Sequence, residues 1–169
     1  WGVLCFCSPI WAQRLTNPSF ERIDPDKMPS GWQVERSDRW QVVRDRSEGR
    51  KGKASLGVHI RQNRTTVEVV GQSVAVEPGR VYALSGWVML EGEVADGFRG
   101  FFRLRWLGDE EKERTGWRGE TTWVQETGDW AESVGTFVAP EGVRKAVVVC
   151  VGEAFGRLFS EGSIRFDDL

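Results

Sequence analysis

The chain has 169 residues, 40% of them hydrophobic, which suits one domain with a real core. Its 23 basic residues are balanced by 25 acidic ones, so no basic excess favours nucleic acid, and we expect no nucleic-acid partner. Nine Trp, nine Phe and twenty Gly against one Tyr are typical of all-β chains, in which aromatic side chains fill sheet faces and glycines form turns.

The first twelve residues form an apolar, uncharged segment that is too short to span a bilayer. Pro9 interrupts this segment, and Ala12 supplies a small residue before the polar Gln13, a pattern typical of the end of a signal peptide. We therefore predict a signal remnant at residues 1–12, a mature domain at residues 13–169, and a secreted, periplasmic or cell-surface protein without membrane insertion. The alternative is that residues 1–12 form a buried first strand.

The strands are predicted from short β-type runs separated by Gly, Pro, Asn and Asp. Residues 15–21 predict an opening strand and turn, and residues 164–169 predict the closing strand. We expect these two ends of the domain to lie close together. The other predicted strands are residues 31–35, 40–43, 55–61, 66–76, 81–90, 98–107, 121–125, 130–138 and 143–151, with charged loops at 44–53 and 108–120.

Two of these runs carry further information. In residues 66–76 the apolar positions change parity near Gly71, which predicts a β-bulge there. Residues 81–90 are apolar at both parities, so we predict a central strand covered on both sides and the most protected strand in the protein. No stretch carries a helical apolar period over about eleven residues. The predicted class is all-β, a β-sandwich or jelly roll.

Several short motifs occur in an order that resembles the carbohydrate-binding modules of families four, nine and twenty-two. The motifs are NPSFE at 17–21, GW at 31–32, SLGV at 55–58, VEPGRVYALSGWV at 76–88, Trp130, FVAPEG at 137–142 and FDDL at 166–169. The resemblance covers nearly all of residues 15–169. It implies a galactose-binding-like jelly roll that binds a polysaccharide or glycan on a concave face or edge loops, without catalysis. It also implies attachment to a further domain in a larger secreted protein.

The resemblance further implies a structural calcium ion between the opening and closing segments. Carried over by position, Glu21 would offer a carboxylate, the loop at 49–53 a carbonyl oxygen, and Asp167 or Asp168 the closing ligand. Calcium takes six to eight oxygen ligands of these kinds. The alternative is that Glu21 caps a turn or pairs with an arginine, and that an aspartate binds backbone amides at the strand end.

Sugar binding needs flat aromatic surfaces, because the C–H face of a pyranose stacks on an indole ring. Trp106 shares a predicted strand face with Phe102 and Leu104, so we assign it to the core. The resemblance places three further tryptophans at framework positions in the core: Trp32, Trp87 and Trp130. The candidates that remain for sugar contact are Trp40, Trp117 and Trp123. Each of the last two could instead cap apolar loop surface.

Three arginines, Arg99, Arg103 and Arg105, share one face of the strand at 98–107. If that face is concave, Arg103 and its neighbours could bind a carboxylated or sulfated glycan, because guanidinium groups pair bidentately with such anions. The alternative is a solvated face balanced by cross-strand acids and by Glu110, Glu111 and Glu113. We expect the arginines to be exposed in both cases.

No motif of enzyme chemistry was found, and we predict that the chain is not an enzyme. Cys150 lies in a Val-rich run, so we interpret it as a small buried apolar residue. The chain has a single histidine, and the sequence gives no support for a catalytic Cys–His pair. Zinc spacing, a phosphate loop and a nucleophile elbow are all missing. Two other readings stay open: a structural or adhesive jelly-roll spacer that contacts proteins without binding sugar, and a glycan-cleaving jelly roll with paired carboxylates.

Overall fold

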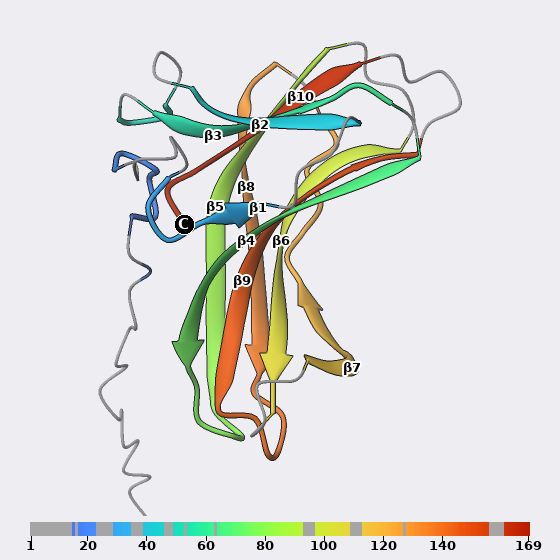
Figure 1. The fold of residues 1–169 in the computed structure, drawn as a ribbon. Helices are drawn as coiled ribbons and strands as arrows, with labels where there is room; N and C mark the ends of the chain where they lie inside the picture. Colours follow the sequence, from blue (N-terminus) through green and yellow to red (C-terminus); the bar gives the residue numbers. More distant parts are fainter. Residues whose placement is uncertain are drawn as a thin grey trace, which may run out of the picture.

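The computed structural model describes residues 15, 17–22, 29–34, 39–45, 49–52, 54–62, 64–92, 97–108, 113–126, 128–155 and 161–169. These residues form ten strands in two antiparallel five-stranded sheets that face each other (Figure 1). Within the described ranges there is no helix, and so none long and apolar enough to cross a membrane. The predicted all-β sandwich is confirmed.

We name each sheet after its central strand. The β9 sheet has the order β1 (Gln33–Val34), β4 (Thr65–Ala75), β9 (Lys145–Ala154), β6 (Phe98–Leu107) and β7 (Glu113–Glu120). The β10 sheet has the order β2 (Trp40–Asp45), β3 (Ser55–Ile60), β10 (Gly162–Asp167), β5 (Val81–Gly92) and β8 (Trp130–Val138). Apart from the pairs β2–β3 and β6–β7, neighbouring strands in each sheet are not consecutive in the chain.

The core lies between the sheets and is built from the inward-facing positions of their strands. Strict alternation on β3 turns Leu56, Val58 and Ile60 inward, as period-two patterning requires. Phe102 of β6 and Phe166 of β10 meet across the interior with ring centroids 5.6 Å apart, in an edge-on arrangement that aromatic pairs favour. The predicted assignment of Trp32 and Trp106 to the core is confirmed, because each is only 3% exposed.

Cys150 is a core residue of β9, and burial raises the pKa of its thiol well above the usual value. The thiolate is the reactive form, so both inaccessibility and the raised pKa suppress reaction. In a protein with Cys5 and Cys7 replaced by Ser, we expect no labelling by a thiol reagent at pH 8 until denaturant unfolds the chain. Fast labelling of the folded protein would contradict this burial.

The opening segment does not form the predicted strand. Asn17 and Phe20 have positive φ angles of 59° and 55°, and the Asn17 side chain bonds the backbone N–H and C=O of Arg22, which closes a turn instead. The two ends nevertheless lie side by side as predicted, because the Leu169 N–H donates to the Pro18 carbonyl at 3.3 Å.

The structure departs from the strand prediction at residues 108–125 and at β5, and confirms the predicted bulge. The predicted loop at 108–120 contains strand β7, and the predicted strand at 121–125 is reduced to one bridge between Val124 and Gly100. The bulge near Gly71 is confirmed by a register shift between Val70 and Ser73. Strand β5 is exposed at alternate positions over its first half, whereas β9 is buried along nearly its whole length, so the prediction that β5 is the most protected strand is wrong.

Candidate functional site

The outer face of the β9 sheet, turned away from the core, carries a second apolar cluster. Phe101, Val149 and Val151 point outward and are nevertheless completely buried. The guanidinium groups of Arg99 and Arg103 lie 5.7 and 5.3 Å from the centre of the Phe101 ring. Long arginine stems and planar heads can cover apolar surface in this way. This face is therefore built in two layers, with arginines above an apolar floor.

Arg103 is held by acids from three neighbouring strands. Its guanidinium bonds Glu120 of β7 at 2.7 Å, pairs with Glu68 of β4, and lies 3.8 Å from Glu153 of β9. The pairing register explains this convergence, because Arg103 stands opposite Val149 on β9 and opposite Glu120 on β7. Arg103 is only 7% exposed, so the expectation that it is exposed is wrong.

The two flanking arginines are also paired. Arg99 Nε donates to Glu153 Oε2 at 2.7 Å, and Arg105 pairs with Glu68. Among the described residues, these three arginines thus meet three glutamates from β4, β7 and β9, and the six charges of this cluster balance. This matches the alternative of a face balanced by cross-strand acids. Glu110 and Glu111 lie outside the described residues.

Trp123 is an exposed aromatic side chain on this face. Half of its surface is open to solvent, and the Arg99 guanidinium stacks over the indole 3.6 Å from the ring centre. The Phe101 ring lies 6.3 Å away at a tilt of 49°. The backbone beside it is anchored to β6 by the Val124–Gly100 bridge. Trp123 is therefore a fixed ring rather than a freely rotating loop side chain.

The other candidate tryptophans have different positions. Trp117 lies on β7, in the same sheet as Arg103, and its side chain is outside what the structure describes. Trp40 lies on β2 of the other sheet and is partly buried against the core, so it does not join Trp123. The residue that the sequence analysis missed is Phe101. Its odd position within residues 98–107, on the same face as the three arginines, carried that signal.

The framework assignment of Trp87 to the core is wrong. Trp87 stands opposite Asp167 on the outer face of the β10 sheet, and the Arg50 guanidinium lies 3.4 Å above its ring. Trp130 is partly buried and pairs with Met89 on the same face. Trp87 directly precedes the inward-facing Val88, and Trp130 directly precedes Ala131, which pairs with Val88, so strand parity directs both tryptophans outward.

The predicted metal residues lie where the opening and closing segments meet. Asp167 is completely buried and accepts backbone N–H bonds from Arg50 at 2.7 Å and Asp168 at 2.8 Å. Burial raises the pKa of Asp167 to about 6, and the nearby carboxylates of Asp168 and Glu21 add to the rise. The two backbone hydrogen bonds act in the opposite direction and lower this pKa. Glu21 itself accepts the Ala54 N–H at 3.1 Å.

This arrangement is partly suited to a cation. Among the described residues, no group of three or more Asp, Glu, His or Cys side chains is arranged to hold a metal. Asp168 pairs instead with Arg50 at 3.3 Å. The exposed Glu21 and the buried Asp167 still place negative charge close together, and carboxylate and carbonyl oxygens are the donors that calcium takes. The calcium ion stays a prediction.

The pKa of Asp167 predicts an unusual pH dependence of stability in EDTA. Between its ordinary pKa of 3.8 and its folded value of about 6, the folded protein binds more protons than the unfolded chain. Stability is therefore lost as pH rises through this window. Relative to Asp167→Asn, we expect the wild type to lose on the order of 2 kcal/mol between pH 4 and pH 7.5, measured by urea unfolding. Parallel curves for the two proteins would contradict the raised pKa.

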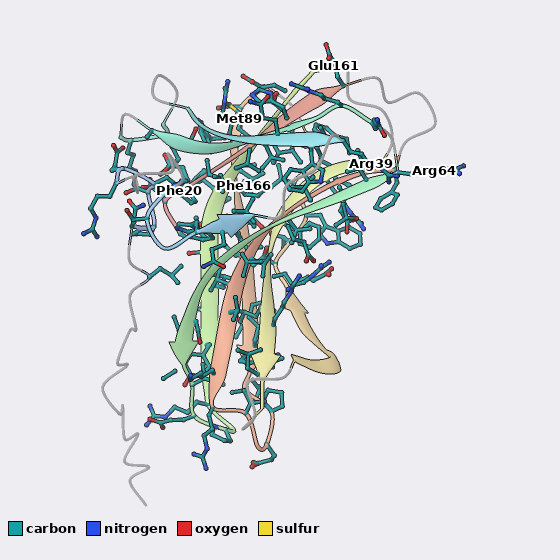
Figure 2. The ribbon with its side chains drawn as sticks, in the orientation of Figure 1. Phe20, Arg39, Arg64, Met89, Glu161 and Phe166 are labelled. Atoms are coloured by element: carbon teal, nitrogen blue, oxygen red, sulfur yellow. The ribbon has the colours of Figure 1, made fainter. Side chains whose placement is uncertain are left out.

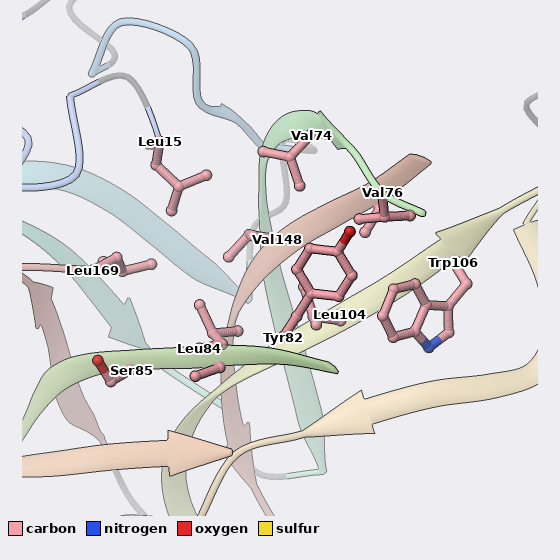
Figure 3. Close-up of a pocket in the computed structure, with 12 residues that line it drawn as sticks. Leu15, Val74, Val76, Tyr82, Leu84, Ser85, Leu104, Trp106, Val148 and Leu169 are labelled. Atoms are coloured by element: carbon pink, nitrogen blue, oxygen red, sulfur yellow. The ribbon is translucent and has the colours of Figure 1, made fainter. Parts of the chain in front are cut away.

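An apolar cavity of about 190 Å³ opens between the sheets (Figure 3). Leu15 and Leu169 line it on one side and Tyr82 and Trp106 on another, so it adjoins the meeting point of the chain ends. The Tyr82 hydroxyl already accepts the Glu77 N–H at 2.8 Å. A small, mainly apolar lining offers few partners for sugar hydroxyls, so we do not place the site here.

Solved structures with a similar fold include carbohydrate-binding modules. The structure resembles the enzymatically active domain of tailspike protein 4 of bacteriophage CBA120 (TM-score 0.64, 14% identity, 90% of this chain and 20% of that chain). It also resembles the CBM22-1–GH10 modules of Clostridium thermocellum xylanase 10B, complexed with xylohexaose (TM-score 0.62, 17% identity, 89% and 26%). A third similar structure is the CBM22-1 xylan-binding domain of Paenibacillus barcinonensis Xyn10C (TM-score 0.58, 17% identity, 89% and 87%).

At these identities the likeness shows the fold, and the chain spans only 20% and 26% of the first two proteins. No curated protein matches the sequence. The sequence of residues 12–153, however, matches the model of the family described as "Carbohydrate binding domain". The match covers most of the chain and confirms the resemblance drawn from its motifs. The chain belongs to this carbohydrate-binding domain family.

Proposed function

We propose that the chain is a non-catalytic module that holds a neutral polysaccharide on the outer face of the β9 sheet, beside Trp123. The observation that carries this proposal is the Trp123 ring, half exposed and braced from one side by Arg99. A fixed indole gives a pyranose ring a flat surface for its C–H face at little cost in side-chain entropy. The paired arginines and glutamates beside it supply donors and acceptors for hydroxyl groups.

The pairing of the three arginines on this face supports a neutral ligand. Each of Arg99, Arg103 and Arg105 already has a glutamate partner, so an anionic glycan would have to displace one carboxylate to pair with a guanidinium. Xylan is the first candidate, because one similar solved structure was determined with xylohexaose and another is a xylan-binding domain.

The module would work as part of a larger secreted protein. Binding a polysaccharide chain would raise the local concentration of an attached domain at its substrate, without any chemical step in the module itself. This context agrees with the apolar residues 1–12, which precede the polar Gln13 as a signal remnant would.

We include a structural calcium ion in this proposal. Glu21, Asp167 and carbonyl oxygens of residues 49–52 would hold it, and its positive charge would offset the buried negative charge at Asp167. We expect millimolar CaCl₂ to raise the melting temperature at pH 7.5 relative to EDTA, and Glu21→Gln to reduce that rise. An equal melting temperature in both solutions would contradict a structural ion.

The function is tested by pull-down on insoluble xylan, cellulose and polygalacturonate, followed by calorimetry with xylohexaose. We expect retention on a neutral polysaccharide and none on polygalacturonate. Retention on polygalacturonate alone would contradict the neutral face.

A second candidate is a spacer that contacts another protein. Three exposed valines favour it: Val81, Val134 and Val138 are 64%, 42% and 60% exposed on neighbouring strands β5 and β8. Such apolar side chains on one sheet face are a feature of protein contact surfaces. A folded protein that binds none of the polysaccharides would favour this reading.

A further inference from the structure

A polar recess lies on the outer face of the β10 sheet, on the side of the sandwich opposite the β9 sheet. Pairing register places four polar side chains in one row across four strands: Gln41 of β2, His59 of β3, Ser163 of β10 and Glu91 of β5. These residues line a cavity of about 440 Å³. Figure 2 shows Glu161, which also lines it, on the outer side of this sheet. The volume falls within the range of small-molecule sites.

Hydrogen bonds hold the polar groups of this row in place. The Ser163 hydroxyl and His59 Nδ1 are 2.6 Å apart, and Arg61 Nη2 donates to Gln41 Oε1 at 2.9 Å. Arg165 lies next to this row on β10, and its guanidinium donates to Glu91 Oε1 at 2.7 Å. The Arg165 side chain is only 10% exposed. Groups fixed in this way are ordered before a ligand arrives, which lowers the entropy cost of binding.

The chemistry of the lining indicates the class of ligand. Glu91 and Glu161 are matched by Arg61 and the adjoining Arg165, so neither an anion nor a cation is strongly favoured. None of the described lining residues is a Trp, Tyr or Phe, so a ligand here would be held by hydrogen bonds and not by stacking. Hydroxyl groups both donate and accept, and they suit a lining that mixes carboxylate, amide, guanidinium, imidazole and hydroxyl groups.

We propose that this recess is a second binding site, which takes a small neutral saccharide through its hydroxyl groups. Within the part of the chain that the structure describes, the His59 ring makes its side-chain hydrogen bond through Nδ1, which leaves Nε2 as a contact for the ligand. The site uses no residue of the β9 sheet, and it is separate from the surface at Trp123.

The single histidine of the sequence makes the test specific. The protein is labelled with ¹⁵N-histidine, and the imidazole resonances of His59 are followed during titration with D-xylose, D-glucose or D-galactose. D-Galacturonate and inorganic phosphate serve as anionic comparisons. We expect a saturable shift with at least one neutral sugar, with a Kd on the order of 1–10 mM. Ser163→Ala and Gln41→Ala should each weaken binding roughly fivefold, with the backbone spectrum confirming the fold.

Trp123→Ala separates this proposal from the proposed function. We expect that variant to lose polysaccharide binding and to keep the full His59 response. Absence of any saturable shift with the neutral sugars would overturn the second site, even if xylan binding by the wild type were intact. A response to galacturonate or phosphate alone would overturn the ligand class. Loss of the His59 response in Trp123→Ala would also overturn the proposal, because the two sites would not be separate.

Discussion

Trp123→Ala should weaken binding of xylohexaose by tenfold to a hundredfold or so, because it removes the exposed stacking surface of the β9 sheet. Half of the Trp123 surface is in solvent, so the free energy of unfolding should fall by no more than about 1 kcal/mol. Calorimetry measures the affinity, and urea unfolding checks the stability. Trp123→Phe, which keeps a smaller ring, should recover part of the affinity.

A matched control is available on the opposite side of the sandwich. Val138 is 60% exposed on β8, so Val138→Ala removes a comparably exposed apolar side chain from the β10 sheet. We expect the Val138→Ala variant to bind xylohexaose with the affinity of the wild type. If Trp123→Ala binds as tightly as Val138→Ala, the sugar surface does not lie at Trp123.

Arg103→Met should destabilise the protein by about 3 kcal/mol. The substitution keeps an apolar stem over Phe101 but removes the charge that Glu68, Glu120 and Glu153 share. Removing one partner from a buried network of ion pairs is costly, because Glu68 and Glu153 keep only Arg105 and Arg99, and Glu120 loses its arginine. The loss is measured by urea unfolding at neutral pH. Adding Glu120→Gln to this variant should restore part of the stability, since it removes the carboxylate that has lost Arg103.

The control for Arg103 is an exposed ion pair in the same protein. Arg80 lies 2.5 Å from Glu77, but the two side chains are 47% and 67% exposed. Arg80→Met should therefore change the free energy of unfolding by no more than about 0.5 kcal/mol. Equal effects of the two substitutions would show that burial does not strengthen the Arg103 network.

Periodicity predicted those strands in which one face is buried. The expected strand at 98–107 has the bounds of β6, and the strand at 130–138 has those of β8. Strand β7 was missed because it is a polar, glycine-containing edge strand, and an edge strand need not show an apolar face. The opening strand was wrong because positive φ angles at Asn17 and Phe20 turn the chain, and such angles are rare for residues other than glycine.

The candidate site could be predicted only in part. Alternation showed that Arg99 and Arg103 share a face, but it could not show which acids stand opposite them. Glu68 and Glu153 reach those arginines through long-range pairing of β4 and β6 with β9, whose register no local pattern contains. Trp123 became a candidate because other tryptophans were assigned to the core. Its stacking with Arg99 could not be predicted from the sequence.

The place of β10 in its sheet has a consequence for how the protein folds. This strand comes last among the described strands, yet it lies between β3 and β5 and pairs with both. Until residues 162–167 have been synthesised, the β10 sheet lacks its central strand. The pair β2–β3 then cannot be joined by backbone hydrogen bonds to the pair β5–β8. Closing such a long loop is slow, as in other proteins dominated by non-local contacts. A ribosome-bound chain that stops short of β10 should therefore remain sensitive to protease, and resistance should arise only after that strand has emerged from the exit tunnel.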